Sequence, residues 1–209
     1  MIAAAHKQAS GYCALKRGID ILGAATLLLV TAPILIIACA LVFVTSGAPV
    51  IHRRRVVGRS GTSFDAYKVR TMVPDADDLL RANPHMREAW LASGKISADP
   101  RVTRVGRVLR RLSIDELPQL LNVIHGDMSL VGPRMLTTEE LPAWGSSASM
   151  ILSVRPGLTG LWQVSGRQQL TREERVRLDD EYVRRMSFGL DLGILLRTVP
   201  AVVSGTGAL

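Results

Sequence analysis

Residues 21–44 read ILGAATLLLVTAPILIIACALVFV, and this stretch decides how the rest of the chain must be arranged. It contains no charged residue across 24 positions. At the helical rise of about 1.5 Å per residue, it would reach roughly 36 Å, enough to span a bilayer. The stretch therefore predicts a membrane helix. An uncleaved signal peptide is the alternative, but the apolar run exceeds a typical signal core and no small-residue cleavage site accompanies it.

Two features favour a helix that enters and leaves the membrane on one side. Pro33 lies near the middle of the stretch, where it removes a backbone donor and clashes with the carbonyl of Leu29, so a kink is expected. Both flanks are basic, and positive flanks prefer the cytoplasmic side. These flanking residues are Lys7, Lys16 and Arg17 before the run and Arg53, Arg54, Arg55 and Arg59 after it. We predict a re-entrant helix hairpin broken at Pro33, and an ordinary kinked span is the alternative that these features leave open.

The composition narrows the class of protein. The 209 residues carry a formal charge of +8 together with a positive mean hydropathy of +0.21, a pairing that soluble nucleic-acid binders rarely show. The chain is long enough for one globular unit beside the membrane segment. Its two cysteines, Cys13 and Cys39, indicate neither a disulfide framework nor a cysteine metal site, which fits a reducing, cytoplasmic environment.

The remaining chain alternates short extended and helical patterns. An extended piece at 48–51, a turn at 58–62 and alternation at 64–70 predict a small hairpin, and 74–92 predicts a helix. Between 99 and 111 an arginine recurs every third residue, which predicts a basic stripe along a helix. That stripe, formed by Arg101, Arg104, Arg107 and Arg110, suits a solvated or headgroup-facing surface as well as anionic-ligand binding.

The chemical centre is predicted at residues 113–116, Ser-Ile-Asp-Glu, which have the spacing of a capping box. With Gly126 as a stop, a helix should run from about Asp115 to His125. Two carboxylates, Asp115 and Glu116, would then lie at a helix start directly after Arg110 and Arg111, which would keep a carboxylate ionised beside a bound phosphate. Cap residues without chemistry are the alternative.

Two loops and two further helices complete the pattern. Residues 127–134 and 155–167 are dense in Gly, Pro and Arg, which suits either bidentate phosphate contacts or ordinary turns. Residues 171–174 form another capping box, and 190–203 reads as an apolar surface-seeking segment.

Taken in order, these motifs resemble the bacterial polyprenyl-phosphate sugar-phosphate transferases, the monotopic phosphoglycosyl transferases. The resemblance covers residues 16 to about 198. The matching stretches are KRGID at 16–20, Ala32-Pro33, YKVRTM at 67–72, DPRVT at 99–103, DELPQL at 115–120, the run 126–134 and the run 155–167. The chain is most similar to the minimal catalytic form of the family. One departure is Ala32, where many members have a serine that could bond the backbone freed by the proline.

The resemblance implies an activity, a cofactor and a set of site residues. The expected reaction transfers a hexose 1-phosphate from a UDP-sugar to polyprenyl (undecaprenyl) phosphate and releases UMP, with galactose or glucose favoured as the sugar. Asp115 and Glu116 are the implied catalytic pair and Mg²⁺ the implied cofactor, with Glu116 as its ligand or as a base. Matching the family pattern also points to substrate-binding roles for Lys68, Arg110, Arg134, Arg167, Asp179 and Asp191.

The combined prediction is an α+β fold: a helix-rich, irregular catalytic domain with a small sheet and an N-terminal re-entrant membrane hairpin. Its expected parts are a tail at 1–15, the hairpin at 16–46 and a catalytic domain at 47–209 resting on the cytoplasmic face of the bacterial inner membrane. No nucleic-acid partner is expected, because nine aromatic residues leave little for base stacking. A homo-oligomer is left open. The rival hypothesis is a basic membrane-anchored module that binds anionic lipid or nucleic acid without chemistry.

Overall fold

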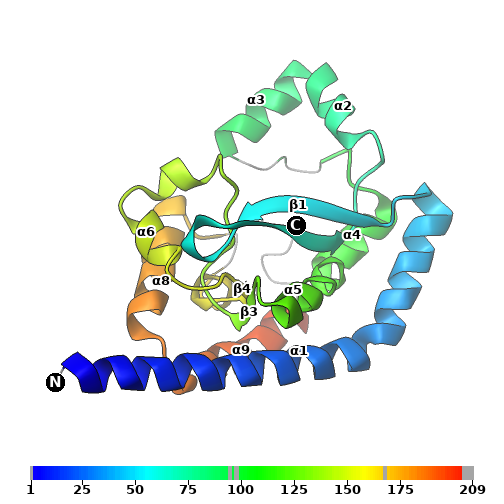
Figure 1. The fold of residues 1–209 in the computed structure, drawn as a ribbon. Coiled ribbons are helices and arrows are strands. Elements are labelled where there is room, and N and C mark those ends of the chain that lie inside the picture. The colour runs from blue at the N-terminus through cyan, green and yellow to red at the C-terminus, as the bar shows by residue number, and fades with distance from the viewer. Residues whose placement is uncertain (1, 94–95, 97–98, 167–168, 204–209) are drawn as a thin grey trace.

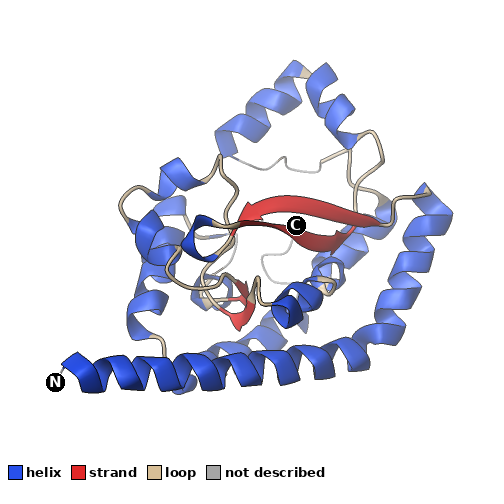
Figure 2. Cartoon of the chain, in the orientation of Figure 1, coloured by secondary structure: helices blue, strands red, loops and turns tan. Residues whose placement is uncertain are grey.

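One long bent helix forms the base and one side of the molecule (Figure 1). The computed structural model describes residues 2–93, 96, 99–166 and 169–203. Within the bend of the long helix, the other helices surround two small sheets (Figure 2). The helix-rich α+β class expected from the sequence is therefore confirmed.

The described elements follow one another along the chain as α1 (Ile2–Ser46), β1 (Ile51–Val57), η1 (Arg59–Gly61), β2 (Ser63–Val69), α2 (Ala76–Ala82), α3 (Pro84–Ser93), α4 (Arg104–Arg111), η2 (Ile114–Glu116), α5 (Gln119–His125), β3 (Ser129–Val131), η3 (Leu141–Trp144), α6 (Ser147–Ile151), β4 (Gly157–Thr159), α7 (Leu161–Val164), α8 (Arg172–Arg185) and α9 (Phe188–Val203). The η elements are single turns of 3₁₀-helix. Helix α1 begins at Ile2, so it also includes the segment expected as an N-terminal tail, and the predicted domain division stays a prediction.

The two sheets join segments in different ways. Strands β1 and β2 form the predicted hairpin, antiparallel from Ile51 opposite Val69 to Val57 opposite Ser63. Strands β3 and β4 pair in parallel and bring together the two Gly- and Pro-rich loops singled out in the sequence. Their backbones approach so closely that a Cβ on Gly157 would lie 2.1 Å from the nitrogen of Gly132. Only glycine fits at that contact.

The bend in α1 separates two arms that pack on different parts of the core. Ala24 and Leu28 of the first arm pack with the main cluster, whereas Ala38 and Val42 of the second arm pack against β2 and α4. The change of partner falls on either side of Pro33, which lies inside the helix and removes one of its backbone bonds. The bend of α1 therefore lies in the region where the sequence predicts a kink, near Pro33.

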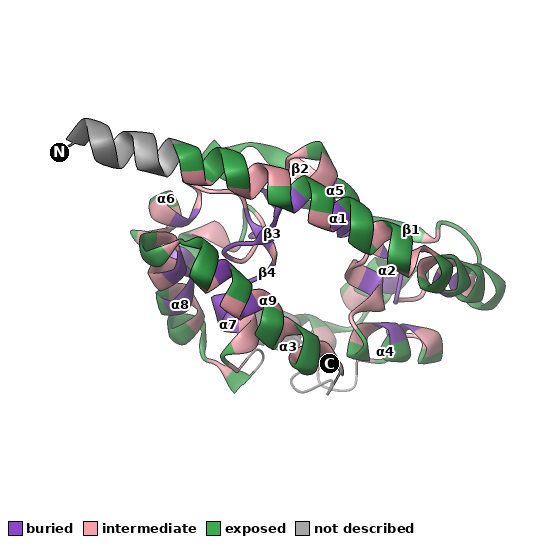
Figure 3. Ribbon diagram, turned by 90° about the horizontal axis from the view of Figure 1, so that it is seen from below, coloured by how far each residue is buried: buried purple, intermediate pink, exposed green. Residues whose placement is uncertain are grey.

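The outward faces of both arms are apolar. By length and composition, residues 11–46 form a helix long enough and apolar enough to cross a membrane. Figure 3 shows α1 and α9 on one face of the molecule, each with an exposed stripe. Helix α9 buries Ile194 and exposes Leu192, Leu196 and Val199, as expected for the surface-seeking segment. The re-entrant topology, in which α1 enters and leaves the membrane on the same side, stays a prediction.

Both ends of the apolar stretch are bonded to the same folded unit. At its start, the Asp20 carboxylate accepts bonds from the Ser129 hydroxyl at 2.8 Å and from the Leu130 N–H at 3.0 Å. Beside it, the Arg17 guanidinium donates to two carbonyls near the end of α5, those of Val123 and Ile124. At its end, Arg70 donates to the carbonyls of Ser46 and Gly47, at 2.6 and 2.8 Å.

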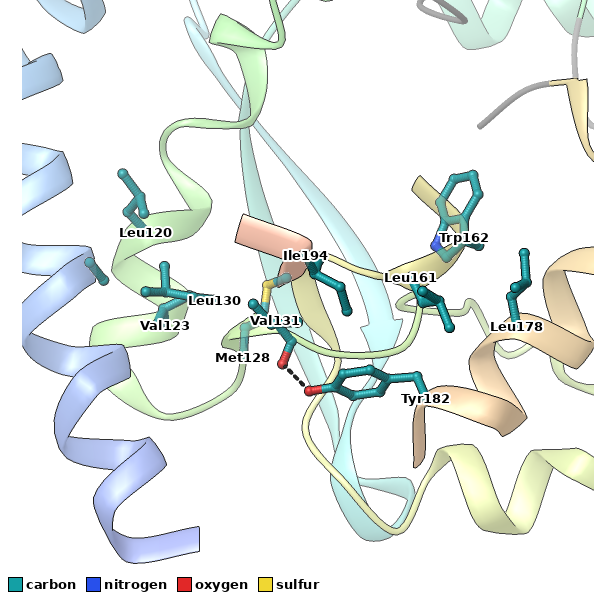
Figure 4. Packing of buried hydrophobic residues seen from close by; sticks show 11 residues of the cluster. Leu120, Val123, Met128, Leu130, Val131, Leu161, Trp162, Leu178, Tyr182 and Ile194 are labelled. Atoms are coloured by element: carbon teal, nitrogen blue, oxygen red, sulfur yellow. Dashed lines mark hydrogen bonds between the residues drawn. The ribbon is translucent and has the colours of Figure 1, made fainter. Parts of the chain in front are cut away.

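The main core lies between α1, α5, α8 and α9 (Figure 4). Its buried members include Leu120, Met128, Val131 and Ile194. Tyr182 belongs to this cluster, and its hydroxyl, whose single proton is shared between two acceptors, lies 3.0 Å from the carbonyl oxygen of Val131 and 2.8 Å from Oδ1 of Asp191. A buried tyrosine hydroxyl needs such a partner, so the bond fixes α8 against β3.

Three expectations about helices require correction. The helix predicted at 74–92 is two helices, α2 and α3, because a residue before proline disfavours helical backbone and Asn83 precedes Pro84. The helix predicted from Asp115 begins at Gln119, because Pro118 has no N–H to donate to the preceding turn. The basic stripe starts at Arg104, since Arg101 is buried before the helix and paired with Asp99 at 2.7 Å.

Candidate active site

The predicted carboxylate pair lies in the single turn η2, between α4 and α5. Asp115 is buried, with 7% of its surface exposed, whereas Glu116 is partly open to solvent. Lys68, near the end of β2, donates to Oε1 of Glu116 at 2.6 Å. Ser113 has a left-handed backbone and its side chain makes no cap bond, so the capping box predicted there is absent. The predicted cap therefore does not hold the pair, and Glu116 is held instead by its ion pair with Lys68.

The electrostatics of Asp115 follow from this burial. Desolvation, together with the neighbouring Glu116 charge, raises the pKa of Asp115 to about 6, while Lys68 and Arg110 oppose the rise. The carboxyl is thus largely ionised at neutral pH but is held in an environment that favours its neutral form. A buried carboxylate of this kind has lost much of its hydration, which is a common feature of catalytic groups.

Arg110 reaches the same site from α4. Its Nε donates to Oγ1 of Thr71 at 2.8 Å, which fixes the guanidinium beside the end of β2. Burial lowers the pKa of Arg110, and the nearby charge of Asp115 opposes that change. Helix α4 can pack this close because Gly106 has no side chain: a Cβ there would lie 2.0 Å from the carbonyl oxygen of Thr71.

Arg134 belongs to a second group, on the loop after β3. Its guanidinium lies 5.4 Å from the ring centroid of Trp162 and 3.5 Å from Oε1 of Glu140. Its backbone N–H donates to Oδ1 of Asp179 at 3.1 Å. Asp179 is fully buried, and burial raises the pKa of its carboxyl to about 7, with Arg134 opposing the rise. The structure thus places Asp179 beneath Arg134, where it supports the loop.

Asp191 lies in a third group, which anchors α9. Its carboxylate accepts bonds from the hydroxyls of Tyr12 and Tyr182 and from Lys16, each at 2.8 Å. Three donors on one buried carboxylate hold α1, α8 and α9 together. A substrate contact for Asp191 stays a prediction.

The β-hairpin connects the first two groups. In the register of the hairpin, Arg54 lies opposite Ala66 and His52 lies opposite Lys68. Arg54 and Lys68 are therefore diagonal neighbours on the same face, a relation that places two such positions about 7–8 Å apart. Arg54 in turn lies 3.6 Å from Oε2 of Glu140. The structure therefore brings Asp115, Glu116, Lys68 and Arg110 into one group and links it to the group of Arg134. Arg167, also predicted, lies outside the described residues.

Sequence reasoning missed several residues of this region. The sequence patterns predict no binding role for Arg54, Glu140, Trp162 or Arg175. In the structure, the guanidinium groups of Arg134 and Arg175 lie 5.4 Å and 5.3 Å from the ring centroid of Trp162. Thr137-Thr-Glu-Glu140 has capping-box spacing, and the reciprocal bonds form, at 2.9 and 3.3 Å. That spacing was the one available signal for Glu140, and it indicates a turn, not a binding site.

The implied magnesium ion would need to share its ligands between the protein and the substrate's phosphates. Among the described residues, no group of three or more His, Cys, Asp or Glu side chains could hold a metal. Mg²⁺ is commonly bound by one or two carboxylates together with substrate phosphates, not by a protein cage. Asp115 and Glu116 offer such a pair of neighbouring carboxylates.

Adjacent carboxylates among arginine and lysine side chains, on a unit joined to a long apolar helix, define a membrane-associated enzyme for phosphate-bearing substrates. The comparisons identify it further. The model of the family described as "Bacterial sugar transferase" matches residues 11–205, and the chain belongs to this family. The sequence prediction of a polyprenyl-phosphate sugar-phosphate transferase is confirmed.

Individual relatives agree with this assignment. The chain is 46% identical over 197 residues to the exopolysaccharide production protein ExoY of Rhizobium meliloti, covering 92% of this chain and 87% of the relative. It is 40% identical over 198 residues to the undecaprenyl-phosphate galactose phosphotransferase of Salmonella typhimurium, covering 93% of this chain and 41% of the relative. It is 38% identical over 203 residues to the UDP-glucose:undecaprenyl-phosphate glucose-1-phosphate transferase of Caulobacter vibrioides, covering 92% of this chain and 71% of the relative.

Proposed function

We propose that this transferase moves a hexose 1-phosphate from a UDP-sugar to undecaprenyl phosphate and releases UMP. The observation that carries the proposal is the buried Asp115 carboxylate, flanked by Glu116, Lys68 and Arg110. The names of relatives from Salmonella and Caulobacter, which specify galactose and glucose, support one of these sugars as the donor's hexose. The reaction would initiate glycan assembly at the cytoplasmic face of the bacterial inner membrane.

Asp115 is the nucleophile in the proposed first step. One of its carboxylate oxygens attacks the sugar-bearing phosphorus of the UDP-sugar, and the bond from that phosphorus to the bridging oxygen breaks. UMP leaves with the bridging oxygen, and the sugar phosphate stays on Asp115 as an acyl phosphate. Because burial has already removed water from the carboxylate, little hydration has to be lost when it attacks.

The second step returns the enzyme to its starting state. A phosphate oxygen of the lipid attacks the same phosphorus, the acyl phosphate bond breaks, and Asp115 leaves as a carboxylate. Glu116 either accepts the proton of the lipid phosphate or serves as a metal ligand, and Lys68 orients it through the 2.6 Å bond. Magnesium, when bound, would neutralise the diphosphate and stabilise the departing UMP.

The arginines would bind the phosphate oxygens. Arg110 is held by Thr71 and Arg134 by Trp162, so both guanidinium groups are oriented before substrate arrives. Arg167 is proposed to act with them. Asp179 and Asp191 would act through the elements that they support, since both are buried among protein donors.

The topology proposed for α1 is re-entrant. Asp20 and Arg17 bond the start of the apolar stretch to β3 and α5, and Arg70 bonds its end to β2. Two ends held by one folded unit support a helix that returns to the side it entered. A straight span would require one set of these bonds to break.

The test of the proposed function uses the full chain in detergent with UDP-galactose or UDP-glucose. Given donor alone, the wild-type enzyme should retain radiolabelled sugar until hydroxylamine, which cleaves acyl phosphates, removes it. UMP should continue to form only when undecaprenyl phosphate is added. Asp115→Asn should abolish both labelling and UMP release, because an amide is a far weaker nucleophile.

Two results would count against this proposal. In the first, the kinetics show a ternary complex and the enzyme takes up no label when lipid is left out. The lipid phosphate would then attack the donor directly, and Asp115 would be at most a metal ligand. No UMP from any UDP-hexose would favour the rival hypothesis of a membrane-anchored binding module.

A further inference from the structure

One acidic side chain lies between two arginines in the region that joins the two groups of the site. Glu140 presents Oε2 to Arg54 at 3.6 Å and Oε1 to Arg134 at 3.5 Å. The two arginines come from distant parts of the chain, β1 and the loop after β3. One guanidinium on each oxygen of a single anion is the arrangement in which two arginines clamp a phosphate.

The contacts of Glu140 with the two arginines are loose. Charge-assisted bonds between arginine and an oxyanion are usually about 2.7–2.9 Å long. Both distances here exceed that range, and the three side chains are partly exposed, from 25% for Arg134 to 40% for Arg54. Ion pairs of this kind contribute little net free energy, so a better anion can displace the carboxylate.

The arginines, in contrast, are well positioned. The Arg134 guanidinium stacks on Trp162, and its backbone is fixed by buried Asp179. Arg54 projects from the paired strand β1, on the same face as Lys68. The clamp therefore lies next to the group that contains Asp115, where a substrate phosphate must approach.

Resting on the proposed function, we infer that Arg54 and Arg134 form a phosphate subsite and that Glu140 is its internal counter-ion, displaced when a substrate phosphate binds. The shared chemistry is a phosphate group of either the nucleotide donor or the lipid acceptor. In the unliganded enzyme Glu140 separates the two positive charges and limits binding of unrelated anions. Arg54 is thereby a substrate-binding residue that the sequence motifs did not identify.

The alternative is that Glu140 is only a cap for the turn η3. Its carboxylate accepts the Thr137 N–H at 2.9 Å, and its own N–H donates to the Thr137 hydroxyl. Glutamine serves in this position of a capping box as well as glutamate does. Glu140→Gln therefore keeps the turn and removes only the charge, which separates the two roles.

The experiment measures the dissociation constant of UDP, and separately of undecaprenyl phosphate, by titration calorimetry of the full chain in detergent. Glu140→Gln should bind at least one of the two about three- to tenfold more tightly than wild type. Arg54→Gln should bind the same ligand about tenfold more weakly. In the double variant Arg54→Gln/Glu140→Gln, the tighter binding produced by Glu140→Gln should disappear. The reason is that Arg54, the charge left without its counter-ion when Glu140 is replaced, is no longer present.

Matched controls remove the same charges nearby. Glu173→Gln changes an exposed carboxylate on α8, and Arg55→Gln changes the next strand residue, which projects from the other face and pairs with Asp65. Both should bind within twofold of wild type. A response to UDP assigns the subsite to the donor, and a response to the lipid assigns it to the acceptor.

The outcomes distinguish this inference from the function on which it rests. If wild type binds UDP and transfers sugar phosphate but Glu140→Gln and Arg54→Gln match their controls for both ligands, the subsite is wrong and the function stands. If wild type binds neither ligand, the proposed function fails with it. Equal thermal unfolding temperatures of the variants would confirm that the capping turn is intact.

Discussion

Replacing Asp115 with asparagine should make the protein more stable while removing its activity. The folded structure raises the pKa of Asp115 from 3.8 to about 6, mainly by burial. That change corresponds to a free energy of about 3 kcal/mol at any pH where the carboxyl is ionised in both folded and unfolded chains. Asparagine carries no charge, so it avoids this cost. Allowing for imperfect hydrogen bonding by the amide, we expect a gain of about 1–3 kcal/mol at pH 8.

The gain must depend on pH with a definite sign. Between pH 3.8 and 6 the folded protein binds the proton that the unfolded chain has lost, so wild-type stability falls as the pH rises through this window. Below 3.8 the aspartate is neutral in both states and should match the asparagine variant. The advantage of Asp115→Asn is therefore full above pH 6 and vanishes as the pH falls toward 3.8.

The assay is thermal unfolding in detergent, followed by circular dichroism at pH 8 and near pH 4. For a chain of this length, about 1–3 kcal/mol corresponds to a rise of roughly 2–12 °C in the unfolding midpoint at pH 8. Asp77→Asn is the control, since Asp77 is exposed on α2 and should change the midpoint little. A midpoint for Asp115→Asn equal to or below that of wild type at pH 8 would refute the reasoning. Wild-type transfer should also decline as the pH falls below about 6.

Further predictions concern the phosphate site, the membrane helix and the anchor of α9. Arg134→Lys should keep the fold but reduce kcat/KM by about 100-fold or more, because lysine cannot make a bidentate contact or stack as well on Trp162; near-wild-type kinetics would show that charge alone is needed. Single cysteines introduced on either side of the apolar stretch, without Cys13 and Cys39, should both be protected from an impermeant outside reagent, and labelling of the N-terminal site alone would show a span. Asp191→Asn should lower the unfolding free energy by about 2–4 kcal/mol, since it removes the buried charge that pairs with Lys16; an unchanged unfolding midpoint would contradict this.

The sequence predicted features that depend on local pattern. The uncharged run of 24 residues, its central proline and the Thr171 capping box require only neighbouring residues, and the structure contains the long helix, a bend that agrees with Pro33 and the reciprocal cap bonds of Thr171. The hairpin followed from alternation and a glycine turn, and its strands pair as expected. The carboxylate pair rests on a distinctive motif at residues 115–120, and its catalytic role stays a prediction.

The sequence did not predict features that depend on tertiary contacts. At Pro84 and Pro118 a disfavoured backbone or a missing donor ends the helical pattern that the neighbouring residues predict. For Asp115, the sequence predicted a helix start that favours the ionised carboxylate, whereas burial raises its pKa. One of the positive charges that oppose this rise, Lys68, lies 47 positions earlier in the chain. Glu140 meets Arg54 only because the loop after β3 lies against the hairpin, an arrangement that no local spacing encodes.

The bonds that tie α1 to the rest of the chain have a consequence for how such a protein can be made. Ala24 has no exposed surface and Val42 only 2%, so the membrane helix supplies part of the interior of the enzyme. Expressing residues 47–209 alone would uncover Leu120, Val123 and Leu109 and leave the Ser129 hydroxyl without Asp20. A fragment without α1 should therefore misfold, because the helix with the apolar outward face also supplies core contacts. Anchor and core are one element in this protein, so an anchor borrowed from another membrane protein would replace this one only if it restored the contacts of Ala24, Val42 and Asp20.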